Sequence, residues 1–147
     1  MKIVLLVEDN GNDIELALEV LGDEGLSSDI FVVKDGQQAL DFLQCSGIHA
    51  GRAPGNPILV MLDLKLPRIS GLEVLRRVKS DPNLRDIPVV MLTSSREECD
   101  LQASYQLGVN AYVVKPVDFL QYSTALKSIG SFWTTTNQPP PEPAALV

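Results

Sequence analysis

Short runs of apolar, largely β-branched residues recur along the chain, separated by segments in which apolar residues are spaced three and four apart. Several runs are continuously apolar rather than alternating with polar residues, which is typical of strands that are covered on both faces of a sheet. The pattern predicts five strands, at residues 2–7, 29–33, 58–62, 87–92 and 111–114.

The segments that follow the strands predict five helices. Four of them present a regular apolar face, and Asn12 or Asp13 is available as the N-cap of the first. The residues of these four faces are, in chain order, Ile14, Leu18 and Leu21; Leu40 and Leu43; Leu72, Leu75 and Val78; and Phe119, Tyr122, Leu126, Ile129 and Trp133.

The remaining helix, the fourth in the chain at about residues 96–107, is mostly polar. Its only residues available for packing are Leu101, Ala103, Tyr105 and Leu107. Because few apolar anchors hold it, we expect this helix to shift more easily than its neighbours.

Strands and helices alternate along the chain, which favours an α/β fold: a doubly wound parallel sheet with helices on both faces. For five strands we expect the flavodoxin-like order 2-1-3-4-5, in which ligands bind beyond the carboxyl ends of strands 1 and 3. One domain is predicted over residues 1–133, followed by a proline-rich tail, residues 134–147, without a core of its own. The glycine- and proline-rich stretch 45–57 is expected to be a surface loop.

The charge of the chain argues against two classes of partner. Its 147 residues include 19 Asp and Glu against 12 Lys and Arg, for a net charge of −7, and residues 1–41 alone carry −8. Such a protein lacks the cationic field that attracts nucleic acids or an anionic membrane. We therefore expect no direct binding to either.

The cysteine content and the N-terminal sequence indicate the cellular compartment of the protein. Cys45, Cys99 and the single histidine, His49, cannot build a disulfide framework or a zinc site, and His49 is expected to be solvated in its loop. The apolar residues near the N-terminus are too few for a signal-peptide core, and no run reaches membrane-spanning length. These features predict a cytoplasmic protein.

Polar residues follow the predicted strands directly, at the edge where this fold binds ligands. Three carboxylates close together repel one another unless a cation lies among them. A set of oxygen ligands suits Mg²⁺, which commonly uses one or two carboxylates together with a phosphate. The residues at the strand ends are Glu8 and Asp9, Asp63, Thr93 and Ser94, and Lys115 and Pro116.

The neighbours of the carboxylates indicate phosphoryl transfer. Lys115 supplies a positive charge and Thr93 a hydroxyl, and both groups stabilise a transferred phosphoryl group alongside a metal ion. Asp63 follows the central strand, with acids on one side and Lys115 and Thr93 on the other. We predict that it is the nucleophile and forms an aspartyl phosphate.

In this order and spacing, the residues resemble the receiver domain of two-component response regulators. The resemblance covers about residues 2–133, and it implies that a phosphohistidine on a partner histidine kinase phosphorylates Asp63. Since no output domain is expected after residue 133, the protein is expected to signal through a phosphorylation-dependent change of binding surface and not as an enzyme. The matching residues are Glu8-Asp9, Asp63-Leu64-Lys65-Leu66-Pro67, Gly71, Thr93-Ser94 and Lys115-Pro116.

The resemblance also implies how the metal and the phosphate are held. Asp9 and Asp63 would bind Mg²⁺ directly, with the backbone carbonyl of Lys65 as a third ligand. Glu8 would act mainly through water, and Lys115 would pair with the phosphate.

Further roles implied by the resemblance concern switching. Thr93 would swing to hydrogen-bond the phosphate, and Tyr112 matches the aromatic residue that turns inward when this hydroxyl moves. Lys65 and Ser95 occupy two positions that tune the lifetime of the phosphate. The Lys115–Pro116 bond resembles a cis peptide that aims the lysine into the site.

Two features resemble, more narrowly, the stand-alone receivers that pair with cyanobacterial and bacterial phytochrome kinases. They are the long loop 45–57 and the sequence Ile129-Gly130-Ser131-Phe132-Trp133. This resemblance implies phytochrome-type light signalling; the alternative is an intermediate in a phosphorelay with a non-phytochrome kinase. Phe132 and Trp133 at a helix end also predict a homodimer built around the last helix.

Two other functions share the predicted fold. An FMN-binding flavodoxin-like protein needs a phosphate loop after strand 1, where this chain has Glu8 and Asp9, whose charges would repel a phosphate. An aspartate-based phosphatase has its nucleophile after strand 1 in an Asp-x-Asp pair, whereas Asp63 follows strand 3. Both functions are therefore disfavoured.

Overall fold

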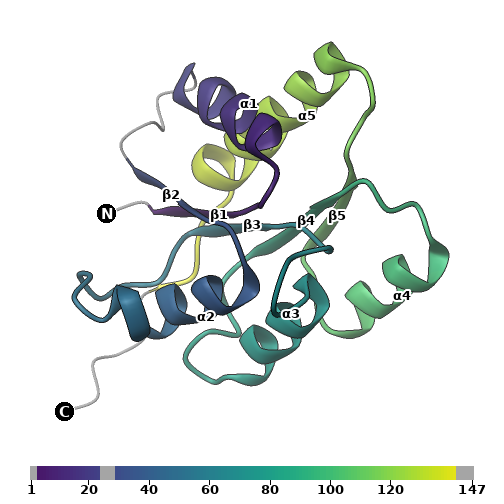
Figure 1. Cartoon of the computed structure of the whole chain (residues 1–147). Helices are drawn as coiled ribbons and strands as arrows, with labels where there is room; N and C mark the ends of the chain where they lie inside the picture. Colours follow the sequence, from purple (N-terminus) through teal and green to yellow (C-terminus); the bar gives the residue numbers. More distant parts are fainter. Residues whose placement is uncertain (1–2, 24–28, 142–147) are drawn as a thin grey trace.

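A five-stranded parallel sheet forms the centre of the part of the chain that the computed structural model describes, residues 3–23 and 29–141 (Figure 1). Its strands are β1 (Val4–Val7), β2 (Ile30–Val33), β3 (Leu59–Leu62), β4 (Val89–Thr93) and β5 (Ala111–Val114). They pair in the order β2-β1-β3-β4-β5, and every pair is parallel. The predicted fold class and strand order are confirmed.

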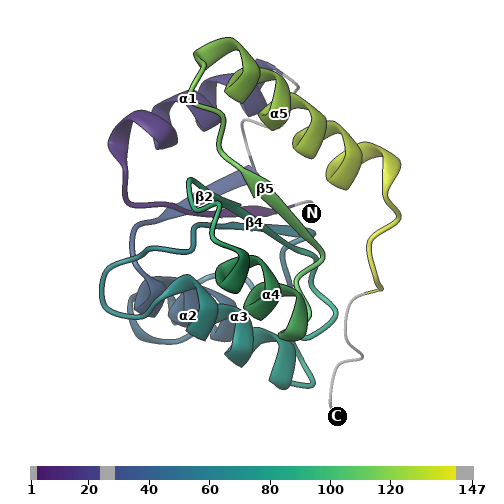
Figure 2. The ribbon, with the colours of Figure 1, turned by 90° about the vertical axis from the view of Figure 1, so that its right-hand side faces the viewer.

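Helices cover both faces of this sheet. The helices are α1 (Gly11–Leu21), α2 (Gly36–Gln44), α3 (Gly71–Ser80), α4 (Glu98–Gln106) and α5 (Phe119–Ser131), with a short 3₁₀ turn η3 (Gly47–His49) and a π-helical turn η4 (Phe132–Thr136). Helices α1 and α5 lie on one face, and α2, α3 and α4 on the other (Figures 1 and 2). None of the described helices has the length and apolar character needed to cross a bilayer.

Two apolar clusters fill the space between the sheet and its helices. Successive strand residues point to opposite faces, so that Leu5 and Val7 pack in the cluster with α2 and α3, and Val4 and Leu6 in the cluster with α1 and α5. All residues of β1 and β3 are buried. This burial on both faces explains why their sequences are continuously apolar.

The register brings the carboxyl ends of the strands level with one another. Val7 pairs with Val33 on one side and with Leu62 on the other. The ladder continues one residue further, because Asp63 N–H donates to the Val7 carbonyl (3.1 Å). At the other side of the sheet, the Lys115 N–H donates to the Thr93 carbonyl (2.7 Å).

Helix α1 begins earlier than its predicted N-cap. The cap is Asn10, whose side-chain oxygen accepts from the backbone N–H groups of Asn12 and Asp13. The prediction of Asn12 or Asp13 as the cap is wrong because the strand leads into the helix through a loop of only three residues, Glu8 to Asn10. Asp13 therefore lies in the first turn, with its side chain free for another contact.

Helix α4 is shorter than predicted and weakly anchored. Its only buried residue is Ser104, while Leu101 and Tyr105 are 39% and 54% exposed. The apolar side chains of this helix thus contribute little packing energy, in agreement with the expectation of a loosely held element.

The loop 45–57 packs on α2. The Arg52 guanidinium lies 4.2 Å from the centre of the Phe42 ring, and its Nε donates to the Phe42 carbonyl. The His49 ring stands edge-on to Phe42, with ring centres 5.2 Å apart, and its Nε2 is buried. The expectation of a solvated His49 is wrong because the η3 turn folds this residue over Phe42.

The chain beyond α5 stays close to the domain over its described part. Thr134 is buried in the η4 turn, and residues 139–141 line a hollow of about 180 Å³ together with loop residues that precede β3 and β4. Residues 142–147 lie outside the described residues. The division of the chain at residue 133 stays a prediction.

Candidate functional site

Three carboxylates meet at the carboxyl ends of β1 and β3. One oxygen from each of Glu8, Asp9 and Asp63 lies within 4.8 Å of the others. The side chain of Glu8 is 4% exposed and that of Asp63 is 12% exposed, whereas Asp9 is open to solvent. The strand ends therefore bring these predicted residues together, on the central strands of the sheet.

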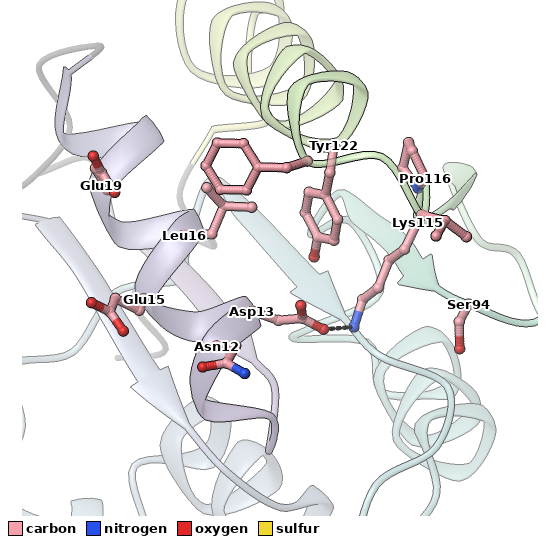
Figure 3. A pocket seen from close by; sticks show the side chains of 11 residues that line it. Asn12, Asp13, Glu15, Leu16, Glu19, Ser94, Lys115, Pro116 and Tyr122 are labelled. Atoms are coloured by element: carbon pink, nitrogen blue, oxygen red, sulfur yellow. Dashed lines mark hydrogen bonds and ion pairs between the residues drawn. The ribbon is translucent and has the colours of Figure 1, made fainter.

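Lys115 reaches into this cluster from the end of β5. Its ammonium group donates to Glu8 Oε1, to Asp63 Oδ2 at 3.1 Å and to Asp13 Oδ2 at 2.9 Å. Figure 3 shows the contact with Asp13, which extends from α1 towards the lysine. The buried cation thus compensates part of the charge of three acids.

Lys115 and Glu8 shift each other's pKa values. Burial raises the pKa of Glu8 to about 7, although the hydrogen bond and charge of Lys115 act in the opposite direction. Burial alone would lower the pKa of Lys115, but the hydrogen bonds to Glu8 and Asp13 and the charge of Asp63 together raise this pKa above its ordinary value. Lys115 is therefore a permanent positive charge at the site.

Asp13 is the residue of this cluster that the sequence analysis missed. Its position five residues after Glu8, in an acidic stretch, was a signal that it could belong to the cluster. Because the start of α1 was uncertain, the sequence did not show on which side of the helix its side chain lies. Only when Asn10 is fixed as the cap does Asp13 fall on the side of α1 that faces Lys115.

Thr93 and Tyr112 are joined through Ser95. Thr93 is 1% exposed, and its hydroxyl oxygen accepts from the Ser95 N–H at 3.3 Å. The Tyr112 hydroxyl donates to the Ser95 carbonyl at 3.0 Å. Burial raises the pKa of Tyr112 above its ordinary value, while this hydrogen bond to Ser95 acts against the rise. The predicted switch residues, at the end of β4 and in β5, thus both contact Ser95 in the β4–α4 loop, and their roles stay predictions.

The backbone around Asp63 is held by close packing. A Cβ atom added at Gly71 would lie 2.1 Å from the Asp63 carbonyl oxygen, so only glycine allows α3 to begin this close to the site. The Gly71 N–H donates to the Leu64 carbonyl (2.8 Å), and the Lys65 N–H points at Asp63 Oδ1 (3.4 Å). The backbone around Asp63 is thus held in place, and its two carboxylate oxygens accept from the Lys65 N–H and the Lys115 ammonium group.

The Lys115–Pro116 peptide is trans, as are all peptide bonds of the described residues. The expected cis bond is therefore wrong. A trans bond is the intrinsically preferred form even before proline, and Lys115 reaches the carboxylates with it.

The donor set fits a hard divalent cation. It consists of carboxylate oxygens from Glu8, Asp9 and Asp63, with no soft sulfur or imidazole ligand in the cluster. The exposed Asp9 leaves one side of the cluster accessible from solvent. Both features suit an ion that exchanges and keeps some of its water.

A surface hollow of about 530 Å³ lies beside the cluster, between α1 and the start of α5 (Figure 3). Its wall is acidic on α1, from Asp13, Glu15 and Glu19, and apolar on the opposite side, from Phe119 and Tyr122. Lys115 also lines this hollow, and its ammonium group bonds to Glu8 and Asp63 of the carboxylate cluster.

Known proteins match this chain along most of its length. The model of the response regulator receiver domain matches residues 4–127. Response regulator Rcp1 of Synechocystis sp. is 40% identical over 135 residues, which cover 92% of this chain and 90% of Rcp1. A crystal structure of Rcp1 in its Mn²⁺-bound form has a TM-score of 0.88 and 39% identity, and the match covers 96% of this chain and 100% of that one.

Two further solved structures are similar. The phosphorylated cyanobacterial phytochrome response regulator RcpA has a TM-score of 0.89 and 40% identity, over 95% of this chain and 99% of that one. The bacteriophytochrome response regulator RtBRR has a TM-score of 0.76 and 55% identity, over 96% and 85%. With this fold, these strand-end residues and these relatives, the chain belongs to the response regulator receiver domain family.

Proposed function

We propose that Asp63 accepts a phosphoryl group from a phosphohistidine of a histidine kinase. The observation that carries the proposal is the position of its carboxylate, held between the acids Glu8 and Asp9 and the ammonium group of Lys115. An Asp63 oxygen forms the new O–P bond as the N–P bond breaks, and the imidazole of the kinase leaves with the electron pair. Incubation of the protein with acetyl phosphate and Mg²⁺, followed by intact mass measurement, tests the transfer.

The proposed metal ion is Mg²⁺. Asp9, Asp63 and the backbone carbonyl of Lys65 would hold it, with Glu8 acting through water. When bound, Mg²⁺ supplies positive charge that offsets the charge of the transferred group. Lys115 supplies a second positive charge and orients the Asp63 carboxylate. The Mn²⁺-bound form of Rcp1, a relative in the same family, supports the binding of a divalent ion.

Phosphorylation would act through Thr93 and Tyr112. The Thr93 hydroxyl moves to the phosphoryl group, and Tyr112 follows because both residues bond to Ser95. The weakly packed α4 begins directly after this loop, so its surface changes with the loop. A receiver domain of this kind is a signalling protein rather than a classical enzyme, and its place of action would be the cytoplasm, with the kinase.

We propose a phytochrome-type kinase as the partner, since RcpA and RtBRR are phytochrome response regulators. The hollow between α1 and α5 is its docking surface. Phe119 was predicted as part of the apolar face of the last helix, but it is 63% exposed as the first residue of α5 and lines this hollow. We expect Phe119→Ala to slow phosphotransfer from the kinase about tenfold, as for an aromatic interface anchor, measured with the purified, autophosphorylated kinase.

Two controls make the docking prediction specific. Labelling of Phe119→Ala by acetyl phosphate should be unchanged, because a small donor needs no docking surface. Phe31→Ala, at a side chain that is 44% exposed on the edge strand β2, should leave phosphotransfer from the kinase unchanged. Equal slowing by both variants would contradict docking at the hollow.

We also propose a homodimer built around the end of α5. Phe132 is 47% exposed, while Trp133 packs partly against its own domain, so that Phe132 is the residue left for a partner. We expect Phe132→Glu to convert a dimer into a monomer, because the interface would have to bury the new charge without a partner. Light scattering at micromolar concentration measures the change, and a monomeric unsubstituted protein would refute the dimer.

A further inference from the structure

Tyr122 is a buried side chain whose hydroxyl makes no hydrogen bond to any residue that the structure describes. The residue is 6% exposed and packs in the apolar cluster with α1 and α5, yet it also lines the hollow between these helices. Figure 3 shows its hydroxyl pointing from α5 towards Asp13 and Lys115. Buried tyrosine hydroxyls usually have a partner, so this one is available to a group that enters the hollow.

Two acids on the α1 side of the hollow are unfavourably placed within the domain. Glu15 and Glu19 are exposed and lie one turn apart, and like charges at this spacing destabilise a helix. Glu19 also lies in the last turn of α1, which has no basic residue and where a negative charge opposes the helix dipole. Neither acid forms an ion pair with a residue in the described part of the chain.

The other groups around the hollow also suit a cation. The single base among the lining residues, Lys115, is already bonded to three carboxylates. Phe119 offers an exposed aromatic ring, whose face attracts a positive charge. Burial raises the pKa of Tyr122 above its ordinary value, so its hydroxyl is neutral at physiological pH and can accept a hydrogen bond from a cationic N–H group.

We propose that the hollow between α1 and α5 is a subsite for a basic side chain, arginine or lysine, of the histidine kinase. Glu15 and Glu19 attract this side chain, and Phe119 packs against its cation. One of its N–H groups donates to the Tyr122 hydroxyl. This inference rests on the proposed function, and it names the chemistry that the docking surface recognises.

The position of the hollow supports this occupant. Lys115 lines the hollow and bonds to Asp63, so the hollow and the acceptor carboxylate are adjacent. A kinase that brings its phosphohistidine to Asp63 therefore places neighbouring side chains over the hollow. The two uncompensated acids of α1 then gain the opposite charge that their own domain does not provide.

The first experiment removes the two charges. The double variant Glu15→Gln and Glu19→Gln should raise the KM of phosphotransfer from the purified, autophosphorylated kinase about tenfold, rather than lower the maximum rate, because charges across an interface act on encounter and docking. Added salt should raise the KM of the unsubstituted protein more than that of the variant. The variant should unfold at an equal or higher urea concentration, since repulsion within α1 is relieved.

The matched control removes two exposed acids outside the hollow, with the double variant Asp86→Asn and Glu98→Gln. This variant should have the unsubstituted KM. Equal KM values in the two double variants would overturn the proposal.

The second experiment tests the hydroxyl. Tyr122→Phe keeps the ring and should raise the KM several-fold without lowering the urea concentration at which the protein unfolds, because the hydroxyl bonds to no described residue of its own domain. An unsubstituted KM in Tyr122→Phe would overturn the proposal.

The third experiment exchanges the charges. Glu15→Lys and Glu19→Lys together should block transfer from the kinase, and replacement by glutamate of one basic residue near the kinase's phosphohistidine should restore it. Each Lys and Arg of that kinase surface is replaced in turn. If none of these kinase variants restores transfer, the occupant is not a basic side chain of the kinase, and the proposal is overturned.

The outcomes distinguish this inference from the function on which it rests. If the unsubstituted protein takes no phosphoryl group from acetyl phosphate or from the kinase, both are overturned. If acetyl phosphate labels it and the kinase does not, the docking surface and the subsite are overturned, while Asp63 stands as the acceptor. If both donors label it and the hollow variants keep the unsubstituted KM, only the subsite is overturned.

Discussion

Asp63→Asn should abolish labelling by acetyl phosphate in the presence of Mg²⁺. The asparagine amide is not a nucleophile towards phosphorus, and it also removes one of the three acidic oxygens that hold a divalent ion. Intact mass spectrometry of the protein after incubation measures the covalent phosphoryl group, and peptide mapping measures its position.

The matched control for this substitution is Asp86→Asn, which neutralises an exposed acid in the turn before β4, at the opposite end of the strands from the cluster. This variant should be labelled at the unsubstituted rate, so that loss of a negative charge alone does not explain the result. Stoichiometric labelling of Asp63→Asn at another residue would refute Asp63 as the acceptor. Rapid turnover of a small phosphate ester by the unsubstituted protein would instead favour the phosphatase alternative.

The strand ends could be predicted because the sequence changes there from apolar to polar residues. Each apolar run stops where a polar residue begins, as at Val7 before Glu8 and Leu62 before Asp63. The parallel topology then places those ends at one edge of the sheet. Burial of the strands and convergence of the site thus follow from the same local pattern, and the fold and the carboxylate cluster were both accessible from the sequence.

Contacts that depend on helix phase or loop path could not be predicted in the same way. The predicted caps, Asn12 and Asp13, lie two and three residues after the observed cap, Asn10, and this shift concealed the contact of Asp13 with Lys115. The hydrogen bonds of Ser95 depend on the path of the β4–α4 loop, and hydrophobic periodicity, which predicts strands and helices, does not predict the path of a loop. His49 was misjudged for the same reason, since only the folded η3 turn places it on Phe42.

Lys115→Met should destabilise the metal-free protein strongly. The side chain of Lys115 is 9% exposed and bonds to three carboxylates, and removal of one partner from a buried ion pair costs about 3 kcal/mol or more. Urea unfolding followed by Trp133 fluorescence, in the presence of a chelator, measures the loss in the free energy of unfolding. Lys127→Met, at an exposed lysine of α5, is the control and should change little.

The destabilisation by Lys115→Met should depend on pH and on the divalent ion. Because burial raises the pKa of Glu8 to about 7 from 4.5 in the unfolded chain, the folded state binds more protons than the unfolded state between these values. The free energy of unfolding therefore falls as pH rises through this window. Lys115 lowers the pKa of Glu8, so its removal raises this pKa further and makes the fall in stability larger. We expect a larger destabilisation near pH ~8 than near pH ~5, and partial recovery when Mg²⁺ replaces the chelator, since the ion supplies the missing positive charge. If Lys115→Met were as stable as Lys127→Met at the higher pH without metal, Lys115 would not be the cation that balances this cluster.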